Sequence, residues 1–151
     1  MNGPNIRKAN EKDCPSLSHL IRQTVLLVNS NDYAPEVINL ICMNFSEEMI
    51  LKKMKKRDVF VYECNKRLLG TISFEESKLH SLFVDNKHLC QGIGTKLVHH
   101  LEQFANLRNV PKIYLSSSIT AKPFYERLGY ELLKFEERSD GSTYLMQKKL
   151  G

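Results

Sequence analysis

The stretch "LCQGIGTKLVHHLEQFA" (residues 89–105) decides the fold, because it places Gly92 and Gly94 between two different kinds of element. The short apolar stretch "KLHSLFV" (78–84) before the glycines is predicted to be a strand. The residues after them recur at helical spacing and predict a helix over 92–107, with a buried stripe of Leu97, Val98, Leu101, Phe104 and Ala105. A glycine turn leading from a strand into a helix suits a phosphate, because the free N–H groups and the dipole of the helix point at the anion.

Two known phosphate-binding patterns do not fit these glycines. A P-loop needs lysine directly after its second glycine, but Thr95 stands between Gly94 and Lys96. A dinucleotide fingerprint needs glycine or alanine where this chain has Leu97. Two interpretations therefore remain open from the glycines alone: a pyrophosphate gripped by backbone amides near the turn, or a tight turn without a ligand.

A second motif, "SSSITAKPFYERLGY" (116–130), follows downstream. Together the two motifs resemble the GCN5-related N-acetyltransferase (GNAT) superfamily, in which a strand ending in valine precedes the turn [QR]xxGxG or [QR]xxGxA and a later short helix carries "FYExxGF". The chain departs from that pattern in three places: at the [QR] position, at a frequent glycine, and at a frequent asparagine, where it has Leu89, Cys90 and Ser118. These departures leave the backbone amides of the turn in place.

The predicted elements mix strands and helices without strict alternation, which indicates one mixed α/β sheet. Strands are predicted at 4–10, 58–64, 68–75, 78–84, 112–118, 130–138 and 143–150, and helices at 11–29, 35–45, 46–56, 92–107 and 121–129. The turn "NKR" (65–67) is predicted to join the strands 58–64 and 68–75 as a hairpin. The resemblance implies the GNAT fold (mixed α+β), a mixed and mostly antiparallel central sheet of six to seven strands flanked by about four helices. It implies a single GNAT acyltransferase domain over 1–151.

The composition excludes several classes of protein. With 42% hydrophobic and 26% charged residues, the chain has no apolar run near the roughly 20 residues that cross a bilayer, and its first residues contain no signal peptide. The four cysteines form no CxxC pair, which argues against zinc and disulfides and favours a reducing cytoplasm. The net charge of +5 is scattered, so we expect no nucleic-acid and no membrane partner, although the charge would attract a small polyanion.

The resemblance implies acetyl-CoA, or another short acyl-CoA, as cosubstrate, with no metal and with direct acyl transfer to an amine. Leu82, Phe83 and Val84 would pair with pantetheine, and residues 89–96 would hold the pyrophosphate. The full predicted set for the cosubstrate is Leu82, Phe83, Val84, Leu89, Cys90, Gln91, Gly92, Ile93, Gly94, Thr95, Lys96, Ser118 and Phe124. Phe124 and Tyr130 are also interpreted as packing residues.

Direct transfer needs a base for the amine and a proton for the departing thiolate. Tyr125 lies at the family's general-acid position, and that role is favoured over core packing. His80 matches a catalytic histidine of some arylalkylamine acetyltransferases. Alternatively, His80 lies on the other face of the sheet or forms part of the wall of the substrate pocket. Strand alternation puts His80, Leu82 and Val84 on one face unless a bulge intervenes. Glu75 and Glu76, placed on the preceding strand, are rival bases that would act directly or through water, and only one of them can face the pocket.

The segment between the first helices commonly walls the acceptor site in this fold. The predicted substrate-binding residues are Tyr33, Phe45 and Phe74, although Tyr33 and Phe45 could equally be core residues. The function expected from the resemblance is transfer of an acetyl group to the primary amine of a small molecule. The alternatives are a protein or peptide N-acetyltransferase, which needs an open groove, and a CoA-binding regulatory module without catalysis. The family also permits a homodimer.

Overall fold

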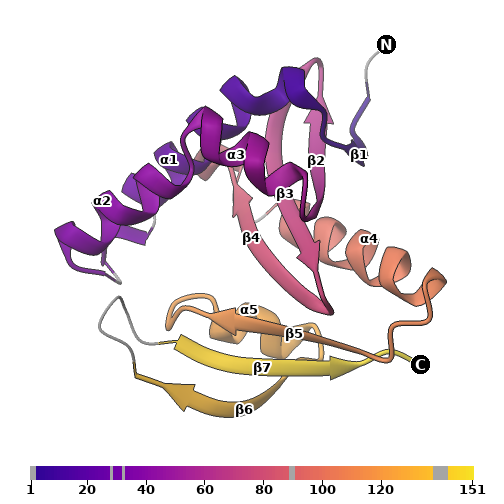
Figure 1. Ribbon diagram of the computed structural model, residues 1–151. Helices are drawn as coiled ribbons and strands as arrows, with labels where there is room; N and C mark the ends of the chain where they lie inside the picture. The colour runs from indigo at the N-terminus through magenta and orange to yellow at the C-terminus, as the bar shows by residue number, and fades with distance from the viewer. Residues whose placement is uncertain (1–2, 28, 32, 89–90, 138–142) are drawn as a thin grey trace.

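The computed structural model describes residues 3–27, 29–31, 33–88, 91–137 and 143–151, and within them a seven-stranded sheet of order β1-β2-β3-β4-β5-β7-β6 (Figure 1). The strands are β1 (Asn5–Lys8), β2 (Asp58–Cys64), β3 (Arg67–Glu75), β4 (Lys78–Val84), β5 (Lys112–Ser117), β6 (Glu131–Glu136) and β7 (Thr143–Lys149). Neighbouring strands are antiparallel except β4 and β5, which are parallel. The predicted mixed, mostly antiparallel sheet is confirmed.

The helices lie on both sides of this sheet. They are α1 (Cys14–Leu27), α2 (Pro35–Asn44), α3 (Glu47–Met54), α4 (Ile93–Leu107) and α5 (Lys122–Arg127), with short 3-10 turns η1 (Glu11–Asp13), η2 (Asn29–Asn31) and η3 (Asn86–His88). In Figure 1, α1, α2 and α3 lie above the first half of the sheet, while α4 lies behind it. We call the two sides of the sheet the α1 face and the α4 face.

Each face of the sheet has its own apolar core, which explains why the central strands show little alternation. Along β2, Phe60 and Tyr62 join the core under α4, whereas Val59 and Val61 join the core under α1 and α3. Seven consecutive residues of β3 are buried. The sequence of a strand covered on both faces is a continuous apolar run without alternation, so it does not predict which side chain faces which helix.

Two tight hairpin turns join β2 to β3 and β3 to β4. The turn between β2 and β3 contains Asn65 and Lys66, with φ of 53° and 64°, and the turn between β3 and β4 contains Glu76 and Ser77, with φ of 49° and 64°. Two successive positive φ values are the mark of the type I′ turns that match strand twist. The first hairpin was predicted. The second corrects the placement of Glu76, which lies in the turn and not on a strand.

Strand β4 is irregular near its middle. The pairing of β3 with β4 shifts between Thr71 and Ser73, and Ser81 has a φ of 54°, which is the geometry of a β-bulge. On its other side, β4 pairs with β5 only at Lys78 and Tyr114. Figure 1 shows the two strands diverging from that point. The edges of β4 and β5 beyond it are therefore not bonded to each other.

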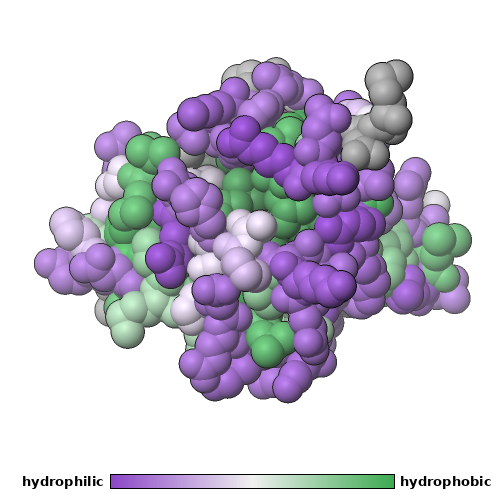
Figure 2. All heavy atoms as spheres, turned by 90° about the horizontal axis from the view of Figure 1, so that it is seen from above, coloured by the Kyte–Doolittle hydropathy of each residue, from purple (hydrophilic) through white to green (hydrophobic). Residues whose placement is uncertain are grey.

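The surface seen from above the α1 face is mostly hydrophilic (Figure 2). Apolar atoms show between the hydrophilic ones at the left, in the centre and at the right of this view. The exposed apolar side chains of α1 and α2 are Leu26, Leu27, Leu40 and Met43. Within the described ranges, no helix has the length and apolarity that a membrane span requires.

Candidate active site

The glycine turn forms the N-terminus of α4. Gly92 is the N-cap residue with a φ of 80°, and it makes no side-chain capping bond. The first backbone bond of the helix runs from the Lys96 N–H to the Gly92 carbonyl at 3.0 Å. Within the described part of the chain, the N–H groups of Ile93, Gly94 and Thr95 have no acceptor. These three donors at a helix N-terminus suit an anion.

Close packing at Gly94 joins the turn to two other elements. A Cβ atom at position 94 would lie 3.2 Å from the Phe124 Cζ atom and 3.8 Å from the Val84 Cγ2 atom. The fold thus brings together Val84, Gly94 and Phe124, which the sequence assigned to the cosubstrate from three separate elements. Of the remaining predicted residues of this turn, Gln91 and Lys96 are exposed, while Leu89 and Cys90 lie outside the described residues.

The electrostatics of the turn also suit a pyrophosphate. The first turn of α4 contains no acidic residue, and Lys96 lies in it. The dipole of a 15-residue helix adds partial positive charge at the same end. The residues present therefore fit the diphosphate of an acyl-CoA through backbone donors, close approach and charge.

The bulge at Ser81 divides the side chains of β4 between the two faces. Leu82 and Val84 pack against the core under α4, whereas Phe83 packs against the core under α1. Before the bulge, Leu79 is in the α4 core, so His80 lies on the α1 face. His80 is therefore on the opposite face from Leu82 and Val84. The simple alternation that put all three on one face does not hold, because the bulge shifts the period.

His80 is half-buried and lies among charged neighbours. Burial is the main cause that lowers the pKa of His80 to about 4, the charges of Arg57 and Lys78 lower it further, and the carboxylate of Glu75 acts in the opposite direction. Glu75, the rival base, accepts a hydrogen bond of 2.9 Å from the Arg57 Nε atom. The imidazole of His80 is thus neutral at pH 7 and can accept a proton, whereas Glu75 is already engaged in an ion pair.

Tyr125 of α5 is buried in the core, edge-on to Phe124 and Tyr130 at centroid distances of 5.1 and 5.9 Å. Burial raises the pKa of Tyr125, so its phenol keeps its proton at neutral pH. No described residue hydrogen-bonds its hydroxyl group. Tyr130, by contrast, donates a 2.9 Å hydrogen bond to Glu102, which fits the packing role expected of it.

The predicted acceptor residues divide between the two faces. Phe45 is buried on the α1 face, where its ring lies 5.5 Å from that of Phe83, and Tyr33 is half-buried against the same core. Phe74 corrects the prediction. It is in the core under α4, with its ring 6.2 Å from that of Phe104, and so faces away from His80.

Ser118, predicted to contact the cosubstrate, has a local structural role as well. Its hydroxyl accepts a 3.1 Å hydrogen bond from the Ala121 N–H, and its carbonyl accepts one of 3.2 Å from the Lys122 N–H. Ser118 therefore shapes the entry into α5 and positions Phe124 and Tyr125.

Several polar residues of the α1 face were not predicted from the sequence. Ser81 lies in the bulge beside His80, and the buried Ser116 Oγ atom on β5 has no hydrogen-bond partner among the described residues. Tyr114 and Ser116 share the face of Lys78, because Lys78 pairs with Tyr114. The run "SSS" marks Ser116 only weakly. Arg57 gives no sequence signal, because it lies outside both motifs.

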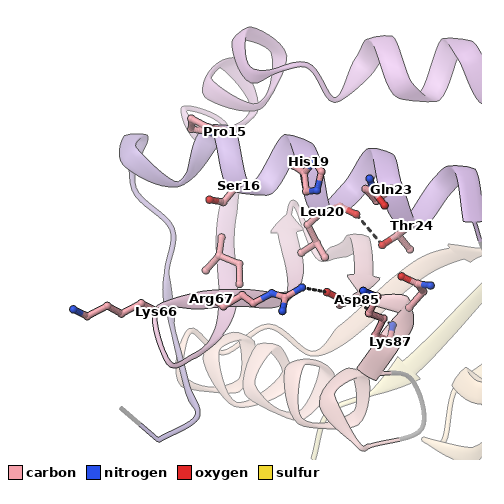
Figure 3. A pocket seen from close by; sticks show the side chains of 12 residues that line it. Pro15, Ser16, His19, Leu20, Gln23, Thr24, Lys66, Arg67, Asp85 and Lys87 are labelled. Carbon is pink, nitrogen blue, oxygen red and sulfur yellow. Dashed lines mark hydrogen bonds and ion pairs between the residues drawn. The ribbon is translucent and has the colours of Figure 1, made fainter. Parts of the chain in front are cut away.

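A separate pocket of about 610 Å³ lies on α1 and contains none of the predicted site residues. Figure 3 shows His19 and Gln23 of α1 above Arg67 and Asp85, whose charged groups lie 3.6 Å apart. The Thr24 hydroxyl donates to the Leu20 carbonyl at 2.8 Å, so it could meet a ligand only as an acceptor. Three or more potential metal ligands do not gather anywhere in the described ranges.

Comparisons with known proteins agree with this geometry. The family model described as "Acetyltransferase (GNAT) domain" matches residues 28–150. The uncharacterized N-acetyltransferase YafP of Escherichia coli (strain K12) is 29% identical over 134 residues, covering 89% of this chain and 85% of that protein.

Solved structures show the same fold. A GCN5-related N-acetyltransferase from Rhodopseudomonas palustris has a TM-score of 0.90 at 18% identity, covering 99% of this chain and 98% of that one. The PaiA N-acetyltransferase of Thermoplasma acidophilum, solved in complex with coenzyme A, has a TM-score of 0.84 at 20% identity, covering 97% and 99%. The family match spans most of the chain, so the chain belongs to the GNAT acetyltransferase family and is an acyl-CoA-dependent N-acetyltransferase.

Proposed function

We propose that this protein transfers an acetyl group from acetyl-CoA directly to the primary amine of a small molecule. The observation that carries the proposal is the juxtaposition at β4. The uncapped amides of Ile93, Gly94 and Thr95 stand at one end of the strand, and His80 lies on its α1 face near the point where β4 and β5 diverge. The groups that would bind the diphosphate of acetyl-CoA and the proposed proton acceptor thus lie along one strand.

Acetyl-CoA supplies an activated acyl carbonyl and a thiolate leaving group. The backbone N–H groups of Ile93, Gly94 and Thr95 would hold its diphosphate, with Lys96 adding charge. Phe83 and Val84 pair with Thr71 and Gly70 of β3 on one side, so only the opposite edge of this part of β4 is left to pair with pantetheine. The unbonded edge beyond Lys78 and Tyr114 is where such pairing fits.

His80 is proposed as the base. An ammonium has no free electron pair, so the acceptor must lose a proton before its nitrogen forms the new C–N bond. The neutral imidazole of His80 accepts that proton, directly or through water.

Tyr125 is proposed as the acid. As the C–S bond breaks, the departing sulfur needs a proton, and the phenol of Tyr125 remains protonated because burial raises its pKa. Its hydroxyl is not committed to any described partner, unlike that of Tyr130. Phe124 and Tyr130 hold the ring from two sides, which fixes the direction of the hydroxyl.

A small-molecule acceptor is favoured by the enclosure of the α1 face. The rings of Phe45 and Phe83 pack together in the core on the α1 face, which leaves no groove between them for a long peptide. Among structures with the same fold, aminoglycoside 6′-N-acetyltransferases act on small molecules. We further propose that residues 1–151 act as one catalytic domain in the cytoplasm, which the unpaired Cys14, Cys42 and Cys64 support.

The test is an acetyl-CoA turnover assay with a panel of small amines and with peptides bearing free N-termini or lysines, read as release of free thiol. Small amines should be acetylated, and Tyr125→Phe should lower kcat. Acetylation of peptides alone would support a protein acetyltransferase instead. Binding of CoA without acetylation of any amine would support a regulatory module, and no CoA binding at all would contradict the proposal.

A further inference from the structure

An arginine lies beside the proposed base. Arg57 precedes β2, and its side chain crosses to the end of β3, where the Nε atom donates to the Glu75 Oε1 atom at 2.9 Å. The side chains of Arg57 and Glu75 are only 19% and 28% exposed. Within the described residues, the two Nη atoms of Arg57 have no hydrogen-bond partner, and neither is among the unpaired atoms sealed from solvent. Glu75 therefore holds the guanidinium in place and leaves its outer edge open.

Strand pairing places this open edge near His80. Ser73 of β3 pairs with His80 of β4, and Glu75, two residues further along β3, pairs with Lys78. Ser73, Glu75 and His80 share the α1 face, since paired residues lie on one side and residues two apart repeat it. The charge of Arg57 is strong enough at His80 to lower the pKa of the imidazole. The two groups thus flank one short stretch of the surface.

The charges around that stretch are mainly positive. Near His80, on the α1 face of β3, β4 and β5, the described cations are Lys78 and Lys112, and the acid Glu75 already pairs with Arg57. Arg67, at the other end of β3, lines the separate pocket and pairs with Asp85. Lys53 of α3 adds a further cation, and its pKa is lowered by burial and then by the charge of Arg57. Acceptors with several ammonium groups would be repelled here, whereas an anionic group would be attracted.

We propose that the acceptor amine also carries a carboxylate, as an amino acid does, and that the Nη atoms of Arg57 bind this carboxylate while the amine lies at His80. This deepens the proposed function and rests on it. An arginine fork matches the two oxygens of a carboxylate, which gives direction as well as charge. Lys78 on the same face assists by charge. The protein would then differ from acetyltransferases whose acceptors are polycations.

The experiment compares matched acceptors on matched variants. Free amino acids and their carboxamides have the same amine but differ in the negative charge, so their kcat/KM ratio reports recognition of the carboxylate. For the unsubstituted protein we expect kcat/KM to be about 10- to 100-fold higher for the acids than for the carboxamides. A change of this size is typical of the loss of a charge-assisted hydrogen bond. In Arg57→Gln that preference should fall to about 2-fold or less, while the KM for acetyl-CoA stays unchanged.

Two further variants separate recognition from folding. Arg67→Gln removes another ion-paired arginine, 3.6 Å from Asp85 in the pocket of Figure 3, and should leave the preference intact. Arg57→Lys keeps the charge without the fork and should retain part of the preference. Equal or better turnover of carboxamides or of a polyamine by the unsubstituted protein would overturn the inference.

The inference and the proposed function can fail separately. If amines are acetylated but without dependence on a carboxylate, only the inference fails. If no amine is acetylated, the proposed function fails, and calorimetric titration of the CoA-loaded protein with an amino acid and its carboxamide decides the inference. Binding of the acid that is lost in Arg57→Gln would support it, and equal or absent binding of both would overturn it.

Discussion

Phe124 of α5 lies so close to Gly94 of α4 that a Cβ atom at position 94 would come within 3.2 Å of the Phe124 Cζ atom. This contact joins the two motifs of the sequence in space. It holds the amide turn against the helix that carries Tyr125, so the groups proposed for the pyrophosphate and for the leaving sulfur are fixed relative to each other.

Gly94→Ala should weaken acetyl-CoA binding by about 10-fold, equivalent to about 1.4 kcal/mol. The added methyl group must displace the Phe124 ring or the turn, and it narrows the approach of a phosphate to the amide. Isothermal titration calorimetry measures the change. Gly3→Ala is the matched control, because nothing lies within 4 Å of that position. Unchanged affinity in Gly94→Ala would mean that the diphosphate does not lie on this turn.

Tyr125→Phe should lower kcat by about 100-fold at an unchanged KM for acetyl-CoA, because only the proton donor is removed. Tyr130→Phe is its control. It loses the hydrogen bond to Glu102, which should cost about 1 kcal/mol in the free energy of unfolding and leave kcat nearly unchanged. Steady-state kinetics with thermal unfolding of both variants checks this. Equal loss of kcat in the two variants would remove the special role of Tyr125.

His80 should make stability depend on pH in a specific window. Its pKa is about 4 in the folded protein and about 6.5 when unfolded, so below pH 6.5 the unfolded chain takes up a proton that the folded protein refuses. Stability is therefore lost as pH falls from about 6.5 to 4, and the loss levels off below that. Since His80 is only half-buried, we expect a loss of the order of 1 kcal/mol.

Chemical denaturation of the unsubstituted protein and of His80→Gln, at pH 7 and at pH 4.5, measures this loss. The gap in the free energy of unfolding between the two proteins should shift in favour of His80→Gln at the lower pH. If the difference in the free energy of unfolding were the same at both pH values, the pKa of His80 would not be lowered by folding. His80 would then be more exposed to solvent than it is in the structure.

Replacing the turn "ES" by Asn-Gly, in the double variant Glu76→Asn with Ser77→Gly, should raise stability by about 0.5–1 kcal/mol. Both positions have positive φ, which asparagine and glycine adopt at lower cost. Differential scanning calorimetry measures the rise in Tm. The kcat should stay within about 2-fold, since Glu76 lies in a turn and not on the α1 face. A marked loss of kcat would restore Glu76 as a candidate base.

The sequence predicted those features that depend on local chemistry. The apolar stripe of α4, the hairpin at Asn65 and Lys66, and the glycine turn all follow from spacing and residue type, and the structure confirms them. The hairpin turn at Glu76 and Ser77 was missed because neither residue is typical of positive φ, and tertiary pairing of β3 with β4 overrides that preference.

The features that the sequence could not predict depend on pairing between distant strands. The bulge at Ser81 moves His80 to the opposite face from Leu82, and no residue type near it signals a bulge. Phe74 was misassigned because β3 is buried on both faces, so alternation could not say which core it enters. Arg57 reaches Glu75 only because β2 and β3 pair at their ends.

The most direct test of the central claim is an NMR titration of the ¹⁵N-labelled protein with acetyl-CoA, read residue by residue at the backbone amides. The account predicts the largest shifts at the amides of Ile93, Gly94 and Thr95, smaller shifts along Leu82–Val84, and little change at Arg67 beside the separate pocket of Figure 3. Shifts centred on that pocket, or no shifts at the glycine turn with acetyl-CoA in excess, would contradict it.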